Sequence, residues 1–468
     1  MVQHKTLKLT AFLVASTLSS MSYGAGFAVA EQSVTGLGRA FAGSAAVADD
    51  ASTIFFNPAG LTYLSNSELA AGLHVINPNS DFRNDGSTMP PDFLGAGGVE
   101  ISGNGDDGGK LAAVPNLYYA HRLNDRMVAG IGINAPFGLV TEYDDDWVGR
   151  YHAIKSEMMT VNINPSFAFK ANDKLSLGFG INLQYVDVEL TKAVDFGGAC
   201  AATAGALIAA GDFGNPLLPV AGNCATPQAF DGKNKLTADD WSWGYNLGLI
   251  YQATDATRIA LAYRSKISHH LTGDGTFEVP NDSDVQTVAG AIGLTDASIT
   301  GDIDLPESAS FALHHQVNDQ WAVMADASWT RWSRFQELAI SSPDPTNKLN
   351  GSVPEKWENN MRYGLGLTYA HNNAWTFRAG VAYDESPISD KYRTARIAGE
   401  DRKWVALGAS YKYSDNIMID AGYTHIFVSD PSLEDESNHD DLGKSYTLSG
   451  DYDASVDILA VQMRWLFL

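Results

Sequence analysis

The segment Trp241–Gln252, WSWGYNLGLIYQ, decides the fold class of this 468-residue chain. Its odd positions carry Trp, Trp, Tyr, Leu, Leu and Tyr, and its even positions carry Ser, Gly, Asn, Gly, Ile and Gln. An alternation of period two is typical of a β-strand with two unlike faces. A soluble sandwich would place Lys and Glu on the polar face, whereas this face is small and uncharged. The pattern indicates apolar side chains toward lipid and small polar ones toward a lumen.

The same alternation recurs after residue 66. We count fourteen such segments, near residues 67–77, 112–121, 126–135, 157–170, 174–190, 239–252, 257–268, 305–316, 320–332, 357–370, 374–384, 401–413, 417–428 and 454–467. Short turns rich in Asn and Asp alternate with long loops, and Asn and Asp suit tight hairpins. An even strand count with short turns at one end is the outer-membrane pattern. We predict an all-β fold, a 14-stranded antiparallel transmembrane β-barrel over residues 67–468.

The N-terminus reads as an export signal. Lys5 and Lys8 precede the apolar segment Leu9–Leu18, which is too short to span a bilayer as a helix, since that takes about 20 residues. We predict a signal peptide over residues 1–24 with cleavage before Ala25, and location in the outer membrane of a Gram-negative bacterium. Charged residues are only 18% of the chain, against about 25% in soluble domains.

Charge and cysteine content exclude several classes of function. Removing residues 1–24 leaves 29 basic and 55 acidic residues, a net charge of −26 compared with −24 for the whole chain. Such acidity argues against nucleic acid as a partner. Cys200 and Cys224 predict one disulfide in an exported protein. The adjacent histidines His269 and His270 point to opposite faces of a strand, and we predict no metal site, no cofactor and no catalytic site.

Residues 25–66 lack the strand pattern and are rich in Gly, Ala and Ser. A 14-stranded barrel lies between small filled barrels and the porins of 16–18 strands that leave a water channel. Its lumen would leak if it were empty. We therefore predict that residues 25–66 form a hatch, or plug, inside the lumen.

Several motifs together carry a family resemblance: Gly36-Leu37-Gly38-Arg39-Ala40, Ala48-Asp49-Asp50-Ala51, Asn57-Pro58-Ala59, Asn134-Ala135-Pro136-Phe137-Gly138-Leu139 and Trp147-Val148-Gly149-Arg150-Tyr151. Through them almost the whole mature chain resembles the FadL-type long-chain fatty acid transporters. The resemblance implies that extracellular loops catch an amphipathic ligand, which moves to a pocket beside the hatch. The ligand then leaves sideways, through a gap at a kinked third strand, without an energy source.

The resemblance also implies roles for single residues. It places Phe27 near the ligand pocket and Lys192 on the ligand carboxylate, although Lys192 also fits a solvated residue at a strand end. The family's second basic contact falls near Val353, with Lys348 and Lys356 as substitutes. Charged residues share the luminal phase, and the ligand-binding candidate Asp384 is one of them: Arg264, Lys266, Arg362, Arg378, Arg402, Arg464, Asp326, Asp384 and Asp420. They indicate either a salt-bridge network that stiffens the barrel or local compensation of the acidic charge.

Two proline motifs are gating candidates. Pro58 removes a backbone donor and disfavours helical geometry at Asn57, so a short helix near Asp50–Phe56 should stop there. Asn57, Pro58 and Ala59 are then either a hatch hinge or an ordinary helix stop. Pro136, Phe137 and Gly138 should end the third strand and open a lateral gap, because proline and glycine interrupt sheet pairing.

Two long loops, over residues 191–238 and 269–304, are unusually apolar. Phe213, Leu217 and Phe277 are our candidates for a ligand groove there. Apolar loop residues either bind something or pack on one another.

The leading hypothesis is a passive channel for long-chain fatty acids. One alternative is uptake of aromatic or other hydrophobic hydrocarbons, and a second is a general porin for polar solutes. We expect a monomer that contacts a fatty acid or similar hydrophobic ligand, outer-membrane lipid and lipopolysaccharide.

Overall fold

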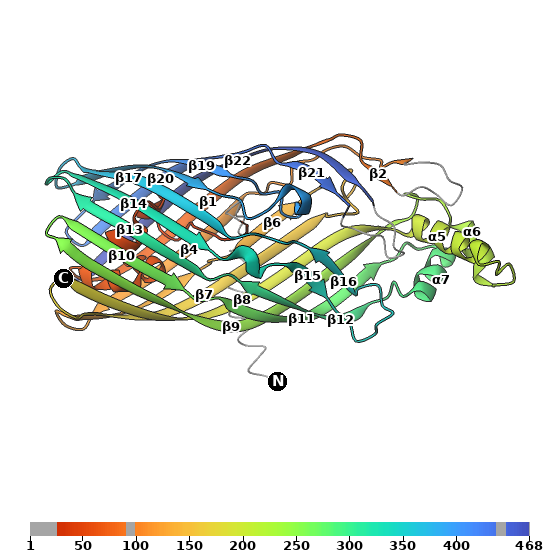
Figure 1. The fold of residues 1–468 in the computed structure, drawn as a ribbon, viewed down its shortest axis with the longest axis horizontal. Coiled ribbons are helices and arrows are strands. Elements are labelled where there is room, and N and C mark those ends of the chain that lie inside the picture. Colours follow the sequence, from red (N-terminus) through yellow and green to blue (C-terminus); the bar gives the residue numbers. More distant parts are fainter. Residues whose placement is uncertain (1–25, 90–98, 437–445, 468) are drawn as a thin grey trace.

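The computed structural model describes residues 26–89, 99–436 and 446–467. Their backbone forms one closed antiparallel sheet of eighteen segments, in which β1 (Ser67–Asn84) pairs along its length with β22 (Leu448–Phe467) (Figure 1). Four crossings consist of two segments each, so the barrel has fourteen crossings and the predicted fold class is confirmed. The predicted signal peptide and its cleavage site lie outside the described residues.

The twelve crossings between β1 and β22 follow one another around the barrel. They are β4 (Ala112–Arg122), β5 with β6 (Met127–Asn134, Gly138–Glu142), β7 (Lys155–Lys170), β8 (Leu175–Asp195), β9 (Asp231–Thr254), β10 with β11 (Thr257–Arg264, Ile267–Glu278), β12 with β13 (Ala297–Leu305, Ser308–Gln316), β14 (Trp321–Thr330), β17 (Asn360–Ala370), β18 (Trp375–Asp384), β19 (Arg402–Lys412) and β20 with β21 (Ile417–Val428, Ser432–Asp435). Each crossing is antiparallel to the next, as short hairpin turns require.

The two faces of the strands differ as the sequence predicted. Along β9, Trp243 and Leu247 are exposed on the outside, whereas Asn246 is buried on the inside. Large apolar side chains are exposed on many strands, among them Leu73, Tyr119, Phe179, Phe311, Leu365, Phe377, Leu407 and Leu459. Among the described residues, no helix has the length and apolar content to cross a membrane.

The described part of the predicted hatch lies inside the barrel (Figure 1). It contains four short helices, α2 (Val34–Leu37), α3 (Ser44–Val47), α4 (Thr53–Phe56) and η1 (Pro58–Tyr63). Helix α2 contacts β19 and β20, α3 contacts β10 and β13, and η1 contacts β7, β8 and β9. These contacts reach opposite parts of the wall, so the segment extends across the lumen at this level.

Several strands are longer than the sequence predicted. β1 continues past the predicted strand end at residue 77, and parts of the predicted loops 191–238 and 269–304 belong to β8, β9, β11 and β12. Hydrophobic alternation marks only the height at which lipid covers the outside, whereas the hydrogen-bonded ladder continues beyond it. There the outward side chains are charged, and Glu189 pairs with Lys155 and Lys235.

Two predictions about the strands are wrong in detail, one about the end of a strand and one about the face on which a residue lies. The third strand does not end at Pro136, because β6 resumes at Gly138 and pairs again with β7. Lys266 does not face the lumen: its side chain is exposed and pairs with Asp304, while the next residue, Ile267, is buried. The register between β9 and its neighbours shifts by one residue near Ser265, and such a bulge exchanges inside for outside.

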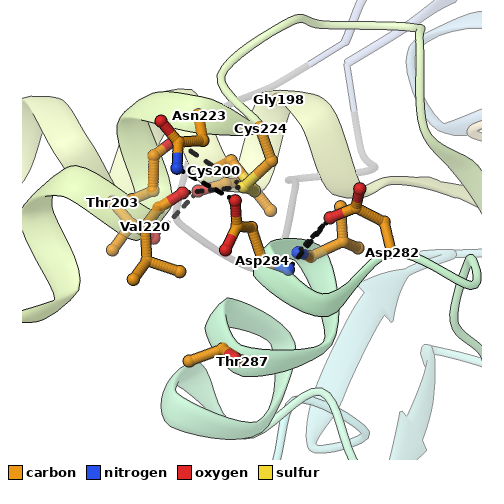
Figure 2. The surroundings of a disulfide bond; sticks show 12 residues. Gly198, Cys200, Thr203, Val220, Asn223, Cys224, Asp282, Asp284 and Thr287 are labelled. Atoms are coloured by element: carbon orange, nitrogen blue, oxygen red, sulfur yellow. Dashed lines mark hydrogen bonds between the residues drawn. A yellow bond between two sulfur atoms is a disulfide. The ribbon is translucent and has the colours of Figure 1, made fainter.

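The loops at one end carry three helices and four short strands. They are α5 (Phe196–Ala209), α6 (Leu217–Asn223), α7 (Ser283–Ile292), β2 (Thr88–Met89), β3 (Val99–Glu100), β15 (Glu337–Ile340) and β16 (Gly351–Pro354). Two 3-10 helices lie in the connections between strands as well: η2 (Trp332–Arg334) follows β14, and η3 (Asp390–Tyr392) follows β18. The predicted pair Cys200 and Cys224 forms a disulfide between α5 and the end of α6, next to α7 (Figure 2). Asn223 donates a hydrogen bond to Asp284 across this contact (3.0 Å).

Candidate functional site

A cavity of about 210 Å³ lies inside the barrel beside the N-terminal segment. Its apolar wall includes Ala28, Val29, Phe41, Phe55, Phe56, Pro136, Phe137, Trp332 and Trp404. Its polar wall includes Ser44, Asn246, Arg264, Ser308, Ser310, Asp326, Ser328, Asn360, Arg362 and Asp384. A cavity with a mainly apolar wall and a few placed polar groups is the usual form of a site for a small organic ligand.

An aromatic cluster bounds this cavity. Phe27 is 2% exposed, and its ring centroid lies 4.7 Å from that of Trp332, 5.4 Å from Trp357 and 5.5 Å from Phe335. Phe137 completes the cluster at 6.2 Å. Phe27 thus stands behind the cavity lining, where Phe137 and Trp332 touch both the cavity and Phe27.

The N-terminal segment is joined to the interrupted third strand. Val29 N–H donates to the carbonyl of Pro136, and Gly138 N–H donates to the carbonyl of Phe27, both at 2.9 Å. These bonds use backbone groups that the gap between β5 and β6 leaves without a strand partner. Phe27 and Pro136–Gly138, two separate predictions from sequence, therefore meet in one contact.

The Asn57-Pro58-Ala59 motif lies over a pair of glycines. Helix α4 ends at Phe56, as the sequence predicted, and Asn57 is fully buried. The Asn57 amide donates to the carbonyls of Ala45 (2.8 Å) and Leu249 (3.2 Å), and its oxygen accepts from Ala59 N–H (3.0 Å). Gly178 and Gly248 face each other across β8 and β9, and a Cβ at either would collide with this motif. The glycines form the notch that receives it.

Ion pairs account for most of the luminal charge. Arg464 contacts Asp420 at 2.7 Å, Arg39 contacts Asp49 at 2.6 Å, and Arg378 lies 3.6 Å from Asp49. Beside the cavity, longer pairs join Arg402 to Asp384 (3.6 Å) and Arg362 to Asp326 (3.8 Å). The network joins the hatch to several strands, which is the structural alternative raised by the sequence.

The remaining ligand candidates lie away from this cavity. Lys192 lies on β8 opposite Asn234 and does not line it. Leu217 and Phe277 pack with the apolar cluster around Cys200 and Cys224. Phe213 is 70% exposed beyond α5. The two long loops thus mainly pack on one another, and an exposed apolar tip remains.

Many residues of the cavity wall carried no site prediction, among them Trp332, Trp404 and Asn246. Trp332 and Trp404 are far apart in the sequence, so no local sequence pattern connects them. Asn246 accepts hydrogen bonds from Asn164 (3.0 Å) and Asn182 (3.2 Å) across three strands. The inward asparagines were visible in the alternation, but their contact was not. Among the described residues, no cluster of His, Cys, Asp or Glu side chains is placed to hold a metal.

Comparison with known proteins agrees with this architecture. A family model described as "Outer membrane protein transport protein (OMPP1/FadL/TodX)" matches residues 15–467. The chain belongs to this family. It is therefore a transport protein of the outer membrane of Gram-negative bacteria. The family is one of transporters rather than enzymes.

Individual relatives cover nearly the whole chain. The long-chain fatty acid transport protein of Escherichia coli strain K12 is 28% identical over 453 residues, which are 91% of this chain and 93% of that protein. A Pseudomonas aeruginosa FadL homologue has a TM-score of 0.81 at 27% identity, covering 95% of this chain and 100% of that one. The P. putida toluene transporter TodX shares the fold, with a TM-score of 0.61 at 19% identity over 89% of this chain and 94% of that one.

Proposed function

We propose that this family member is a passive channel for long-chain fatty acids, with ligand capture in the extracellular loops. The observation that carries the proposal is the interior cavity. It combines an aromatic wall with a few charged groups and is bounded by the N-terminal segment where that segment binds the third strand. The name of the E. coli relative supports fatty acids as the substrate class.

The proposed route follows the contacts described above. The exposed tip around Phe213, between α5 and α6, offers an apolar surface to an incoming ligand. The ligand then occupies the cavity, and movement of residues 27–29 away from Pro136–Gly138 opens a lateral outlet into the outer leaflet. Asn57-Pro58-Ala59 serves as the hinge of the hatch in this proposal, and no step requires a cofactor.

Two other functions remain distinguishable by experiment. Uptake of aromatic hydrocarbons is the second candidate, and it is favoured by the aromatic character of the cavity wall. A general porin is disfavoured, because residues 26–66 extend across the lumen and contact opposite parts of the wall. We propose that the channel acts as a monomer, whose exposed apolar belt contacts lipid and lipopolysaccharide.

Transport assays test the proposal. A deletion strain carrying the protein should take up oleate faster than the same strain with an empty vector. Toluene uptake in the same pair of strains tests the second candidate, and a polar sugar tests the porin alternative. If oleate uptake is equal in the two strains, the proposed function is wrong.

A further inference from the structure

Arg264 differs from the other charged residues of the cavity wall. It is the last residue of β10 and faces the lumen just before the bulge at Ser265. Its guanidinium donates to the side-chain oxygen of Asn182 (2.7 Å) and to the carbonyl of Phe55 (2.8 Å). Both acceptors are neutral, and Arg264 forms no ion pair with any residue that the structure describes.

The neighbouring charges are already compensated. Arg362 lies beside Asp326, and Arg402 lies beside Asp384. The polar groups near Arg264 include the Tyr118 side chain and two amides, those of Asn182 and Asn246. The Asn182 amide donates to the Asn246 side-chain oxygen, and Asn246 lines the cavity beside Arg264. A cation inside a protein is costly unless an anion or several hydrogen bonds compensate it. The wall of the cavity therefore holds one positive charge whose described neighbours supply no matching carboxylate.

The guanidinium is also held in place. Its central carbon lies 4.2 Å from the ring centroid of Phe55, on the hatch helix α4. Arginine has five N–H donors in a planar fork, and two of them are engaged in the bonds above. A carboxylate can accept two parallel hydrogen bonds from such a fork. Phe56, Phe137 and Trp332 continue the cavity wall as an apolar surface for the rest of a ligand.

We infer that Arg264 is the anchor for the carboxylate of the transported ligand, and that it makes the cavity selective for monocarboxylates with a long apolar chain over neutral hydrocarbons. The inference rests on the proposed function and names the residue that decides between its two candidate substrate classes. Since Phe55 and Asn182 hold the guanidinium, one group on the hatch and one on the wall both shape the anchor.

The test compares an acid with its ester on the purified full-length protein in detergent. Oleate and methyl oleate compete with a fluorescent fatty acid for the wild type and for Arg264→Gln. The wild type should prefer oleate by about tenfold or more, as expected for a charge-assisted pair. Arg264→Gln should lose most of this preference through weaker oleate binding, with methyl oleate unchanged. Arg264→Lys should keep part of it, because lysine retains the charge without the fork.

Arg258→Gln is the matched control. Arg258 lies on the same face of β10 and likewise forms no ion pair with a described residue, but it contacts Val47 and Tyr63 and does not line the cavity. Its substitution should leave the preference for oleate intact.

Each other outcome overturns a stated claim. Equal loss of oleate and methyl oleate binding in Arg264→Gln would give Arg264 a structural role only, and an unchanged preference would remove it from the site. Failure of the wild type to bind either compound contradicts the proposed function itself. If Arg264→Gln misfolds, its heat-modifiable band on electrophoresis will be lost. In that case Arg264→Lys tests the inference, which requires this variant to keep a preference for oleate over methyl oleate.

Discussion

At the scale of single residues, absent side chains matter as much as present ones. Gly178 and Gly248 leave the space that Asn57 and Pro58 occupy, and the Asn57 amide donates to the carbonyls of Ala45 and Leu249. The sequence showed Gly248 as a small luminal residue. It could not show that Gly248 faces Gly178 on the next strand or that the hatch motif lies on both glycines, because these contacts join residues that are far apart in the sequence.

We predict that Gly248→Ala loosens the hatch. A Cβ at this position would lie 1.8 Å from the Asn57 side-chain oxygen, so Asn57 must move. Overpacking of this kind costs about 1–3 kcal/mol. Planar-bilayer recordings should show more frequent opening than in the wild type. Gly351→Ala on β16, where a Cβ meets nothing within 4 Å, is the control. Equal opening frequencies in wild type and Gly248→Ala would contradict the prediction that the glycine notch holds the hatch in place.

A buried carboxyl group predicts that the stability of one loop depends on pH. Glu355 lies just beyond β16, and its burial raises the pKa from 4.5 to about 8, although it accepts a hydrogen bond from the Trp357 indole (3.0 Å). The folded loop therefore binds more protons than the unfolded one between these pH values. Its stability should fall as pH rises from about 5 to 8.

Glu355→Gln should abolish this dependence and stabilise the loop at pH 8. Hydrogen exchange of residues 351–359 at pH 5 and pH 8, corrected for intrinsic rates, measures the effect. Glu337→Gln changes an exposed glutamate on the paired strand β15 and serves as the control. Identical pH profiles for wild type and Glu355→Gln would refute the assignment.

At the scale of elements, the interrupted strand and the N-terminal segment form one unit. The sequence identified Pro136 and Gly138 as a break, but it could not supply the partner that fills the break. That partner is the stretch around Ala28, which forms a bridge with Phe137. Backbone groups inside a barrel must find partners, and here a segment far away in the sequence provides them.

Cross-linking this unit should block transport. The double variant Ala28→Cys/Phe137→Cys, made in a Cys200→Ser/Cys224→Ser background, places two thiols at bridged positions. Oleate uptake should fall at least about tenfold under oxidising conditions and recover with a reductant, because the proposed outlet needs the two segments to separate. The single variant Ala28→Cys controls for the substitution itself. Uptake that is indifferent to oxidation, with the cross-link verified by mass spectrometry, would exclude an outlet at this position.

At the scale of the whole molecule, different interactions stabilise the barrel wall and the hatch. The wall closes through the long β1–β22 ladder, whereas residues 26–66 are held to it by ion pairs, such as Arg378–Asp49, and by glycine contacts. Apart from the break at Pro136–Gly138, where residues 27–29 supply backbone hydrogen bonds, the ladder of the wall closes on its own strands.

Deletion of residues 29–64 should turn the protein into an open pore. A 14-stranded barrel is too wide for its own side chains to fill. The deletion variant should still insert and show the heat-modifiable band of a folded barrel, but with a steady conductance that the wild type lacks. A folded deletion variant without conductance would show that the wall and loops alone seal the lumen.

The sequence by itself determined the number of strands, their two faces, the disulfide pair and the family, because alternation, turns and motifs are local properties of the chain. Only the tertiary structure decided that Lys266 faces outward after a one-residue bulge, that Phe27 joins Trp332 and Trp357, and that Arg264 reaches the cavity without an acidic partner among the described residues. The physical reason is closure. A barrel brings together strands far apart in the sequence, and the partners of a luminal side chain depend on the register of every strand between them.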